Sequence, residues 1–268
     1  MVSAAFLSPA DRCAMTQTLL ETDSLTVRFG GHVAVDNVTC SFKAGELTAI
    51  VGPNGAGKTT YFNLISGQIT ASAGTVRLMG EDVTRDPVAQ RCRKGLGRAF
   101  QLTNLFPNLT VLENVRLVIQ ARRRMGFNLF SMASSHTELT VAAMAVLDRV
   151  RLHDLREQKV GGLSHGNQRK LEVAILIALD PMVYMFDEPT AGMSVDEAPV
   201  VLDLIAELKA DTDRTILLVE HKMDVIRSLA DRIIVLHNGE LAADGDPATV
   251  MASDVVQEAY MGRDLADV

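Results

Sequence analysis

The sequence lacks features that would place it among disulfide-rich, secreted or membrane-spanning proteins. It has only three cysteines, Cys13, Cys40 and Cys92, an odd number without metal-ligand spacing, which favours reduced thiols in a cytosolic protein. No window approaches the ~20 apolar residues of a membrane span, and the longest apolar run covers only residues 173–179. The short apolar stretch at the amino terminus is soon broken by polar residues, unlike a secretion signal. We therefore expect a chain that does not cross a membrane.

An excess of positive charge is also missing. The formal net charge is -7, which disfavours nonspecific binding to nucleic acid or anionic lipid. Hydrophobic residues make up 47% and charged residues 22% of the 268 residues, as in ordinary folded proteins. The length allows one domain, or one domain with a subdomain. We expect no nucleic-acid partner.

The pattern of apolar runs predicts an α/β fold. Several runs are nearly continuous, which is typical of parallel strands covered on both faces. Between residues 110 and 177 helical periodicity takes over and predicts an inserted helical part. The Asn-Gly pair in 237–240 predicts a hairpin, and Ser194 to Glu197 reads as a capping box that opens a helix. Strands are predicted at residues 24–29, 46–51, 75–79, 183–186, 215–219 and 232–236.

One glycine-rich stretch carries the most specific chemical signal. An apolar strand precedes it and a helical run follows, which is the context of a phosphate-binding P-loop. Glycines let consecutive backbone N–H groups curl around phosphate oxygens, and the helix adds its positive end. Lys58 would then meet the β- and γ-phosphates, and the Thr59 hydroxyl would ligate Mg²⁺. The stretch reads Gly52-Pro53-Asn54-Gly55-Ala56-Gly57-Lys58-Thr59-Thr60.

A second signal is an apolar strand that ends in two carboxylates. Residues 183–186 lead directly into Asp187 and Glu188. Beside a P-loop, Asp187 would hold Mg²⁺ directly or through water. Glu188 would be the general base that polarises the attacking water, a role that contributes ~10²–10⁴-fold in rate. A phosphate-bearing nucleotide and Mg²⁺ are the ligands that these two elements predict, and the resemblance described next implies that the nucleotide is ATP.

Three further motifs narrow the class: Arg98-Ala99-Phe100-Gln101, Leu163-Ser164-His165-Gly166-Asn167-Gln168 and Leu218-Val219-Glu220-His221. With them the chain, from about Leu20 to Tyr260, resembles the ATP-binding-cassette (ABC) ATPases. The resemblance implies a RecA-like P-loop core with an antiparallel β-subdomain and a helical subdomain inserted at about 102–178. It also implies one ABC ATPase domain over 19–268 with a C-terminal tail from about 244. The sequence before that domain predicts a flexible leader over 1–18.

The resemblance assigns roles to single residues. Gln101 matches the glutamine that reaches toward Mg²⁺ and water, and His221 matches the histidine that bonds the γ-phosphate. Phe29 matches the aromatic residue that stacks on adenine, although a core Phe at a strand end is the alternative reading. Ser164 and Gly166 match the signature loop, which in this family contacts the γ-phosphate held by a second protomer. The family therefore implies a head-to-tail dimer with two ATP molecules between the chains.

The chain departs from the usual family residues at three positions. His165 replaces a glycine and Asn167 replaces a glutamine, while Ser194 stands where the wider superfamily often has Asp. These changes put in doubt the detailed geometry of the signature loop and any water-positioning role for residue 194. They leave Ser164 and Gly166 in place.

Finer features resemble the ATP-binding subunits of high-affinity branched-chain amino acid importers. They include Phe29-Gly30-Gly31, the stretch 105–115, the extension near 126–135 and the tail 259–262. That branch implies a second ATPase subunit, membrane permease subunits that dock beside Gln101 and residues 105–112, and indirectly a substrate-binding protein. The location implied is the cytoplasmic face of the membrane. Urea importers, lipopolysaccharide exporters and soluble ATPases of iron–sulfur cluster assembly stay open as alternatives, and so does the role of the arginine-bearing segment 122–135.

Overall fold

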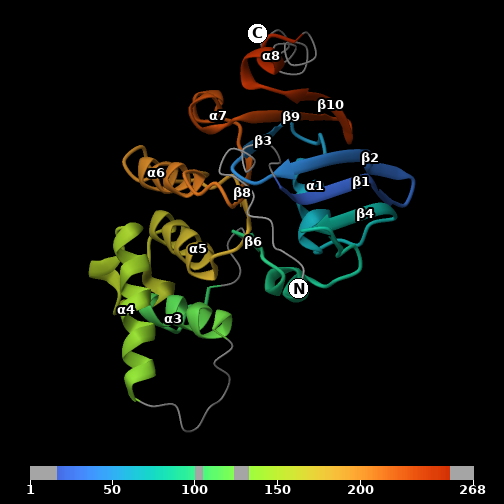
Figure 1. Ribbon diagram of the computed structural model, residues 1–268. Coiled ribbons are helices and arrows are strands. Elements are labelled where there is room, and N and C mark those ends of the chain that lie inside the picture. Colours follow the sequence, from blue (N-terminus) through green and yellow to red (C-terminus); the bar gives the residue numbers. More distant parts are fainter. Residues whose placement is uncertain (1–16, 100–104, 124–132, 254–268) are drawn as a thin grey trace, which may run out of the picture.

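The computed structural model describes residues 17–99, 105–123 and 133–253, and Figure 1 shows two sheets with helices packed around them. The larger sheet has six strands in the order β10-β9-β3-β8-β7-β6. Its pairs are parallel except β9–β10, which is antiparallel. Its strands are β3 (Leu47–Val51), β6 (Leu96–Arg98), β7 (Val183–Asp187), β8 (Thr215–Val219), β9 (Arg232–His237) and β10 (Glu240–Gly245).

The smaller sheet is antiparallel and has the order β2-β1-β4-β5. The chain passes from β2 to β3 of the larger sheet, returns for β4 and β5, and then reaches β6, so three segments join the two sheets. The predicted α/β architecture with a separate antiparallel part is confirmed. The strands of the smaller sheet are β1 (Thr18–Phe29), β2 (His32–Lys43), β4 (Ala73–Leu78) and β5 (Glu81–Asp82).

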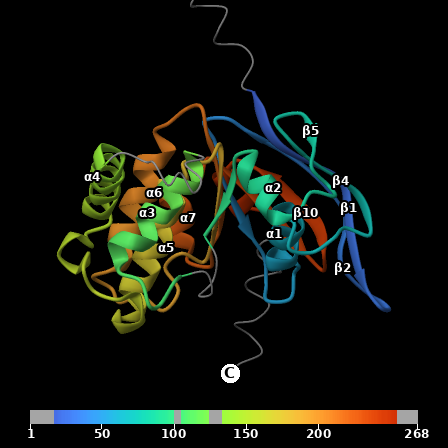
Figure 2. The same cartoon turned by 90° about the horizontal axis from the view of Figure 1, so that it is seen from below.

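Alternating side chains of β7 show how the large sheet is covered on both faces. Tyr184 and Phe186 belong to the core that includes the helices α3 to α6, whereas Val183 and Met185 belong to the core with α1 and the smaller sheet. Successive side chains of a strand point to opposite faces, so these helices lie on opposite sides, as Figures 1 and 2 show. The helices are α1 (Lys58–Ser66), α2 (Val88–Arg93), α3 (Val111–Arg122), α4 (Ala133–Arg149), α5 (His165–Leu179), α6 (Ala198–Lys209), α7 (Met223–Leu229) and α8 (Pro247–Met251).

The helices α3, α4 and α5 follow β6 and precede β7 in the chain. A capping box opens α3, since Glu113 N donates to Thr110 Oγ1 (3.1 Å) and Thr110 N donates to Glu113 Oε2 (2.7 Å). The buried Asn114 amide bonds the backbone N–H and C=O of Phe106. This fixes the loop before α3, in which the Phe106 ring is 56% exposed. None of the helices in the described ranges has the length and apolar character needed to cross a bilayer.

Two local predictions have opposite outcomes. The hairpin is confirmed, because β9 pairs with β10 through a turn in which Asn238 and Gly239 both have positive φ. The capping box at Ser194 is wrong as a helix start, because α6 begins at Ala198 with Glu197 at its N-cap. Ser194 Oγ instead donates to the Glu197 carboxylate (3.1 Å). The strand β2 (His32–Lys43) was not predicted.

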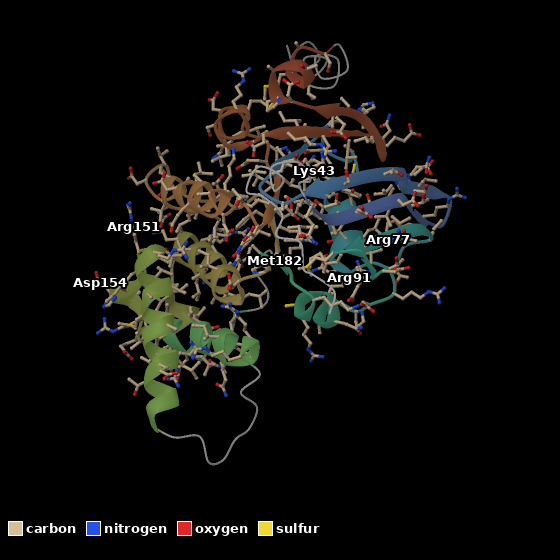
Figure 3. All side chains as sticks on the ribbon, in the orientation of Figure 1. Lys43, Arg77, Arg91, Arg151, Asp154 and Met182 are labelled. Atoms are coloured by element: carbon tan, nitrogen blue, oxygen red, sulfur yellow. The ribbon has the colours of Figure 1, made fainter. Side chains whose placement is uncertain are left out.

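A buried arginine on α2 fixes the far end of α1. Arg91, labelled in Figure 3, is 2% exposed, and its Nη1 donates to the carbonyl oxygens of Leu64 (2.7 Å) and Ile65 (2.6 Å). Burial lowers the pKa of this guanidinium, while Asp86 and Asp82 oppose the shift. Since the last carbonyls of a helix lack partners inside it, Arg91 satisfies them and anchors the helix that follows the glycine-rich loop.

Candidate functional site

The glycine-rich loop joins β3 to α1, and conformation favours glycine at three of its positions, while space also requires it at Gly52 and Gly57. Gly52, Gly55 and Gly57 have φ of 149°, 84° and 97°, a region that other residues rarely adopt. A Cβ on Gly52 would lie 2.1 Å from the backbone oxygen of Leu236, and one on Gly57 would lie 2.6 Å from that of Ala34. The surrounding strands therefore force this path on the loop.

A lysine stands at the start of α1, inside the loop. Lys58 is only 6% exposed, and its Nζ donates to the carbonyl oxygens of Gly52 (2.7 Å) and Pro53 (2.9 Å). Thr59 follows it on the first turn and is exposed. A helix start offers free N–H groups and a positive dipole end. The loop thus presents a cation, backbone donors and a hydroxyl to an anion.

The turn between β9 and β10 supports the loop from behind. Gly239 N donates to Ala56 O (3.1 Å), and Ala56 N donates to Pro53 O (3.1 Å). Ala56 is buried, whereas Asn54 is exposed and Thr60 is half-buried. Ala56 thus faces the protein, whereas Asn54 borders solvent.

Asp187, at the end of β7, forms a buried ion pair with Arg98 at the end of β6. Arg98 Nη2 donates to Asp187 Oδ2 (2.7 Å), and the two side chains are 6% and 2% exposed. Arg98 Nη1 also donates to Asn63 Oδ1 (2.7 Å) and Ser66 Oγ (3.0 Å) on α1. Burial lowers the pKa of Arg98, and Asp187 opposes that shift. This arginine joins the helix after the loop to the acidic strand end, a role that sequence reasoning did not assign.

The second oxygen of the Asp187 carboxylate has no hydrogen-bond partner among the residues that the structure describes. Oδ1 is buried and accepts no hydrogen bond in the described part of the chain. An unpaired buried carboxylate oxygen is costly unless something binds it. In the described ranges no group of three or more His, Cys, Asp or Glu side chains is placed to hold a metal ion. Any ion here would need ligands from elsewhere, such as a hydroxyl or a phosphate.

Glu188 and His221 meet although 33 residues separate them in the chain. His221 Nε2 lies 2.7 Å from Glu188 Oε1, and the side chains are 38% and 31% exposed. Because an ionised carboxylate only accepts, Nε2 carries the proton of this bond. Glu188 has φ 49°, an unusual conformation for a non-glycine residue that often occurs at functional sites. The sequence-predicted base and histidine thus form one pair.

A buried glutamate orients the turn that carries His221. Glu220 is 3% exposed and accepts from Thr190 Oγ1 (2.7 Å) and from the backbone N–H groups of His221 (2.7 Å) and Lys222 (3.4 Å). Glu220 lies within the motif at residues 218–221, but the sequence analysis predicted no role for it. A signal was present, since a carboxylate between apolar strand residues and a histidine needs buried partners.

The signature loop, residues 163–168, opens α5. Ser164 is the N-cap and accepts from the backbone N–H of Asn167 (3.3 Å). Gly166 is buried in the first turn. This helix packs with α3 and α4, on the face of the six-stranded sheet opposite to α1. The structure therefore brings together the P-loop, Asp187, Glu188 and His221, and it places Ser164 and Gly166 on a separate helix.

The two other predicted site residues have different outcomes. Phe29 lies at the end of β1 and is 49% exposed, so the alternative of a core phenylalanine is wrong. Its exposed face is available for stacking. Gln101 lies outside the described residues, and so do Cys13 and the tail 259–262. The extension near 126–135 also lies outside them in its larger part.

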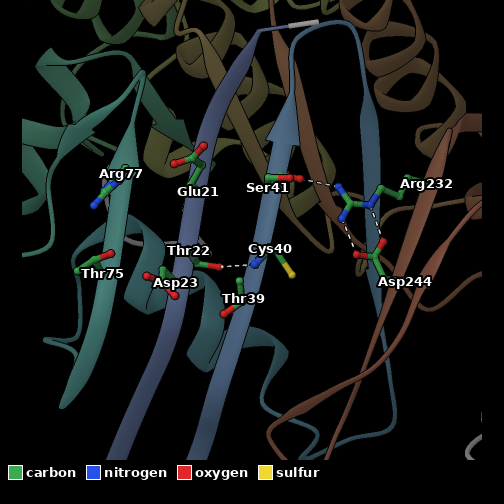
Figure 4. Close-up of a pocket in the computed structure, with 10 residues that line it drawn as sticks. All are labelled: Glu21, Thr22, Asp23, Thr39, Cys40, Ser41, Thr75, Arg77, Arg232 and Asp244. Atoms are coloured by element: carbon green, nitrogen blue, oxygen red, sulfur yellow. Dashed lines mark hydrogen bonds and ion pairs between the residues drawn. The ribbon is translucent and has the colours of Figure 1, made fainter. Parts of the chain in front are cut away.

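A polar pocket of about 380 Å³ lies between the smaller sheet and the β9–β10 hairpin (Figure 4). Arg232 forms two 2.6 Å bonds with Asp244 and donates to Ser41 O (2.5 Å). This pairing raises the pKa of Arg232, and burial raises the pKa of the Cys40 thiol to about 11. Cys40 is buried, and none of the predicted site residues lines this pocket. Its charged pair ties the hairpin to β2.

The sequence matches a known protein family and curated transport proteins. The family model described as "ABC transporter" matches residues 35–191. The high-affinity branched-chain amino acid transport ATP-binding protein BraF of Pseudomonas aeruginosa is 35% identical, covering 93% of this chain and 100% of the relative. LivG of Escherichia coli, with the same description, is also 35% identical with the same coverage.

Solved structures agree with the sequence relatives. A nucleotide-free ATP-binding cassette from an ABC transporter has a TM-score of 0.77 and 28% identity, covering 91% of this chain and 98% of the other. A cassette in its ADP conformation has a TM-score of 0.77 and 29% identity, covering 92% and 100%. A dimeric post-hydrolysis cassette bound to ADP and Pi has a TM-score of 0.73 and 27% identity, covering 85% and 98%.

Proposed function

We propose that this chain, which belongs to the ABC transporter family and is an ATP-binding, ATP-hydrolysing subunit, energises the import of branched-chain or related amino acids through partner membrane subunits. The observation that carries the substrate class is the 35% identity to BraF and LivG over 93% of the chain. Both relatives are described as transport ATP-binding proteins for these amino acids.

The P-loop is proposed to bind the triphosphate of ATP. In the described structure the Lys58 ammonium donates to the carbonyls of Gly52 and Pro53, so it is held at the mouth of the loop. Phosphate oxygens are stronger acceptors than these carbonyls because they carry charge. The exposed ring of Phe29 is proposed to stack on adenine, a contact worth ~1–3 kcal/mol for an aromatic platform.

The residues present also fit a magnesium ion. Asp187 Oδ1 is buried and finds no partner in residues 17–99, 105–123 and 133–253, and the exposed Thr59 stands on the first turn of α1. We propose that Asp187 and Thr59, together with Gln101, hold the ion beside the phosphates. When bound, Mg²⁺ neutralises charge that develops on the β- and γ-phosphates.

Glu188 is proposed to accept the proton of the attacking water. Its Oε2 is left for the water, because Oε1 is occupied by His221 Nε2 at 2.7 Å. His221 is proposed to orient this carboxylate and to reach the γ-phosphate. Glu220 holds the backbone of His221 from behind, which keeps the imidazole on the same side as the base.

Ser164 and Gly166 are proposed to act on ATP bound by a second subunit. The start of α5 presents a hydroxyl and free N–H groups, which suit a γ-phosphate. In this chain α5 and α1 lie on opposite faces of the sheet. One related cassette is a dimer bound to ADP and Pi. These observations support a head-to-tail pair, either of this chain with itself or with a paralogous subunit.

Changing Ser164 to Ala is expected to slow ATP hydrolysis by about 10- to 100-fold, the effect of losing a hydrogen bond to a charged group. Binding of ATP to the dilute single chain should stay within about twofold of wild type, since the hydroxyl acts across the dimer. Steady-state hydrolysis and fluorescent nucleotide binding measure the two effects. Ser164→Asn is the matched control, because Asn keeps the N-cap but removes the hydroxyl; normal turnover in that variant contradicts the trans role.

The loop before α3 is proposed to receive the permease subunits. Phe106 is 56% exposed, and Leu105 is half-buried next to it. Asn114 fixes this loop through two bonds to Phe106, so the ring is presented on a rigid support. An exposed aromatic ring on a fixed loop suits the insertion of a short helix from a partner. The chain is therefore proposed to lie on the cytoplasmic face of the membrane, held there by these subunits.

Deletion of the gene for this chain is expected to remove at least about 90% of high-affinity uptake of labelled leucine, isoleucine and valine, because without its ATPase the permease cannot cycle. Uptake should return with the wild-type gene but not with the Glu188→Gln gene. Uptake of urea serves as the control solute. Unchanged amino acid uptake with lost urea uptake would assign the chain to the urea branch instead.

A further inference from the structure

The signature loop packs against the loop that follows β7 in the same chain. The ring of His165 lies on Gly192, since a Cβ placed there would be 3.0 Å from His165 Cε1 and 3.2 Å from Nδ1. Gly192 lies four residues beyond the proposed base Glu188. The two loops therefore touch within one subunit, independently of any partner.

A carboxylate covers the second residue of α5. A Cβ on Gly166 would lie 2.1 Å from Glu197 Oε2, and 2.4 Å from both Oε1 and Cδ. The φ of Gly166 is not in the positive region, so its backbone conformation suits any residue. The Glu197 carboxylate of the same chain takes the space beside Gly166, so a Cβ here would have to displace it.

That carboxylate is held from two sides. Glu197 Oε2 accepts from the backbone N–H (3.3 Å) and the hydroxyl (3.1 Å) of Ser194, and Lys170 Nζ lies 3.9 Å from Oε1. Lys170 also donates to Asn167 Oδ1 (3.3 Å), and Asn167 N donates to Ser164 Oγ (3.3 Å). A continuous series of contacts therefore runs from Ser194 through Glu197 to the proposed phosphate-binding hydroxyl.

This network contains the residues that the family resemblance marks as departures from the usual sequence. Asn167 and Ser194 are members of the network, and His165 makes the adjoining contact with Gly192. The amide of Asn167 is the acceptor that Lys170 uses, and the hydroxyl of Ser194 is a donor that Glu197 uses. The three departures thus serve a single interface between the signature loop and residues 192–197.

We propose that Glu197 is a positioning residue that fixes the signature loop against residues 192–197 of its own chain, so that Ser164 is held ready for the partner's nucleotide. The inference rests on the proposed role of Ser164 and Gly166 across the dimer. Glu197 itself touches no phosphate in this scheme. It acts on the start of α5 by filling the space above Gly166, and Ser194 and Lys170 prevent it from swinging away.

The test is a double-variant cycle on thermal stability. Gly166→Ala should lower the melting temperature of the otherwise unchanged chain by about 3 °C or more, because the methyl group meets the Glu197 carboxylate. In the Glu197→Ala background the same change should raise the melting temperature by about 1–3 °C, since Ala favours helix over Gly. An equal shift in both backgrounds would overturn the cis contact. The single variant Gly166→Ala could fail to fold. In that case a double variant Gly166→Ala/Glu197→Ala that folds supports the proposal. If neither the single nor the double variant folds, the proposal is overturned.

A kinetic measurement separates positioning from packing. Glu197→Ala should lower kcat about tenfold, a coupling typical of contacting residues, while ATP binding to the dilute single chain stays within about twofold. Glu197→Gln keeps an acceptor for Ser194 and should recover at least half of the wild-type kcat. Glu207→Ala, on the exposed side of α6, is the matched control and should leave kcat unchanged. A normal kcat in Glu197→Ala overturns the positioning role of Glu197. A normal kcat in Ser164→Asn overturns the proposed role of Ser164 across the dimer, but it does not affect the contact tested by the stability measurements.

Discussion

Replacing Glu188 by Gln is expected to lower ATP turnover by about 100-fold or more, the size of a lost general base. Gln keeps the shape of the side chain and can still accept from His221 Nε2, which lies 2.7 Å from Glu188 Oε1. It cannot take a proton from water. The loss should therefore appear in kcat, while the affinity for ATP stays within about twofold.

The same variant should collect as an ATP-bound dimer. ATP holds the two chains together in the proposed sandwich, and hydrolysis releases them, so a chain that binds but does not hydrolyse stays closed. Size-exclusion chromatography with ATP and Mg²⁺ should show the dimer, and the same run with ADP should show the monomer. Glu240→Gln, an exposed change on β10, is the control and should turn over and elute like wild type. Turnover of Glu188→Gln within tenfold of wild type would contradict the assignment of the base.

Local motifs predicted the strand and helix that flank the glycine-rich loop, because the spacing that defines such a motif is local. The P-loop needs only the spacing of Gly52 to Thr60 between a strand and a helix, and the structure has β3 before it and α1 after it. The acidic end of the strand at residues 183–187 could also be predicted from a local pattern, since Asp187 is the last residue of β7. The pairing of Glu188 with His221 followed once β7 and β8 became neighbours.

Tertiary contacts limited the rest of the prediction. Arg98 and Asp187 are 89 residues apart, and they meet only because β6 pairs with β7 at the edge of the sheet. Glu197 looked like a capping residue for Ser194, yet its carboxylate lies on Gly166, and the helix begins one turn later than the motif predicts. The strand β2 was missed because exposed and buried residues alternate along it irregularly.

The second large effect is expected at the Arg98–Asp187 pair. Arg98→Met should destabilise the metal-free chain by about 3–5 kcal/mol, the usual cost of leaving a buried charge without its partner. Both side chains are nearly inaccessible, at 6% and 2% exposure, and Asp187 Oδ1 already lacks a partner in the described part of the chain. Water therefore cannot replace the arginine. Urea unfolding in the presence of a chelator measures the change.

Adding Asp187→Asn to Arg98→Met should recover about 2 kcal/mol or more of that loss, because the buried charge is then removed as well. The bonds of Arg98 to Asn63 and Ser66 are absent from both variants and cancel in the comparison. The exposed pair Arg149–Glu207, with a similar distance of 3.0 Å, is the matched control. Arg149→Met should cost less than about 1 kcal/mol, since solvent screens exposed ions. If the double variant is no more stable than Arg98→Met alone, Arg98 does not serve as the counter-ion of Asp187, and its bonds to α1 account for its burial.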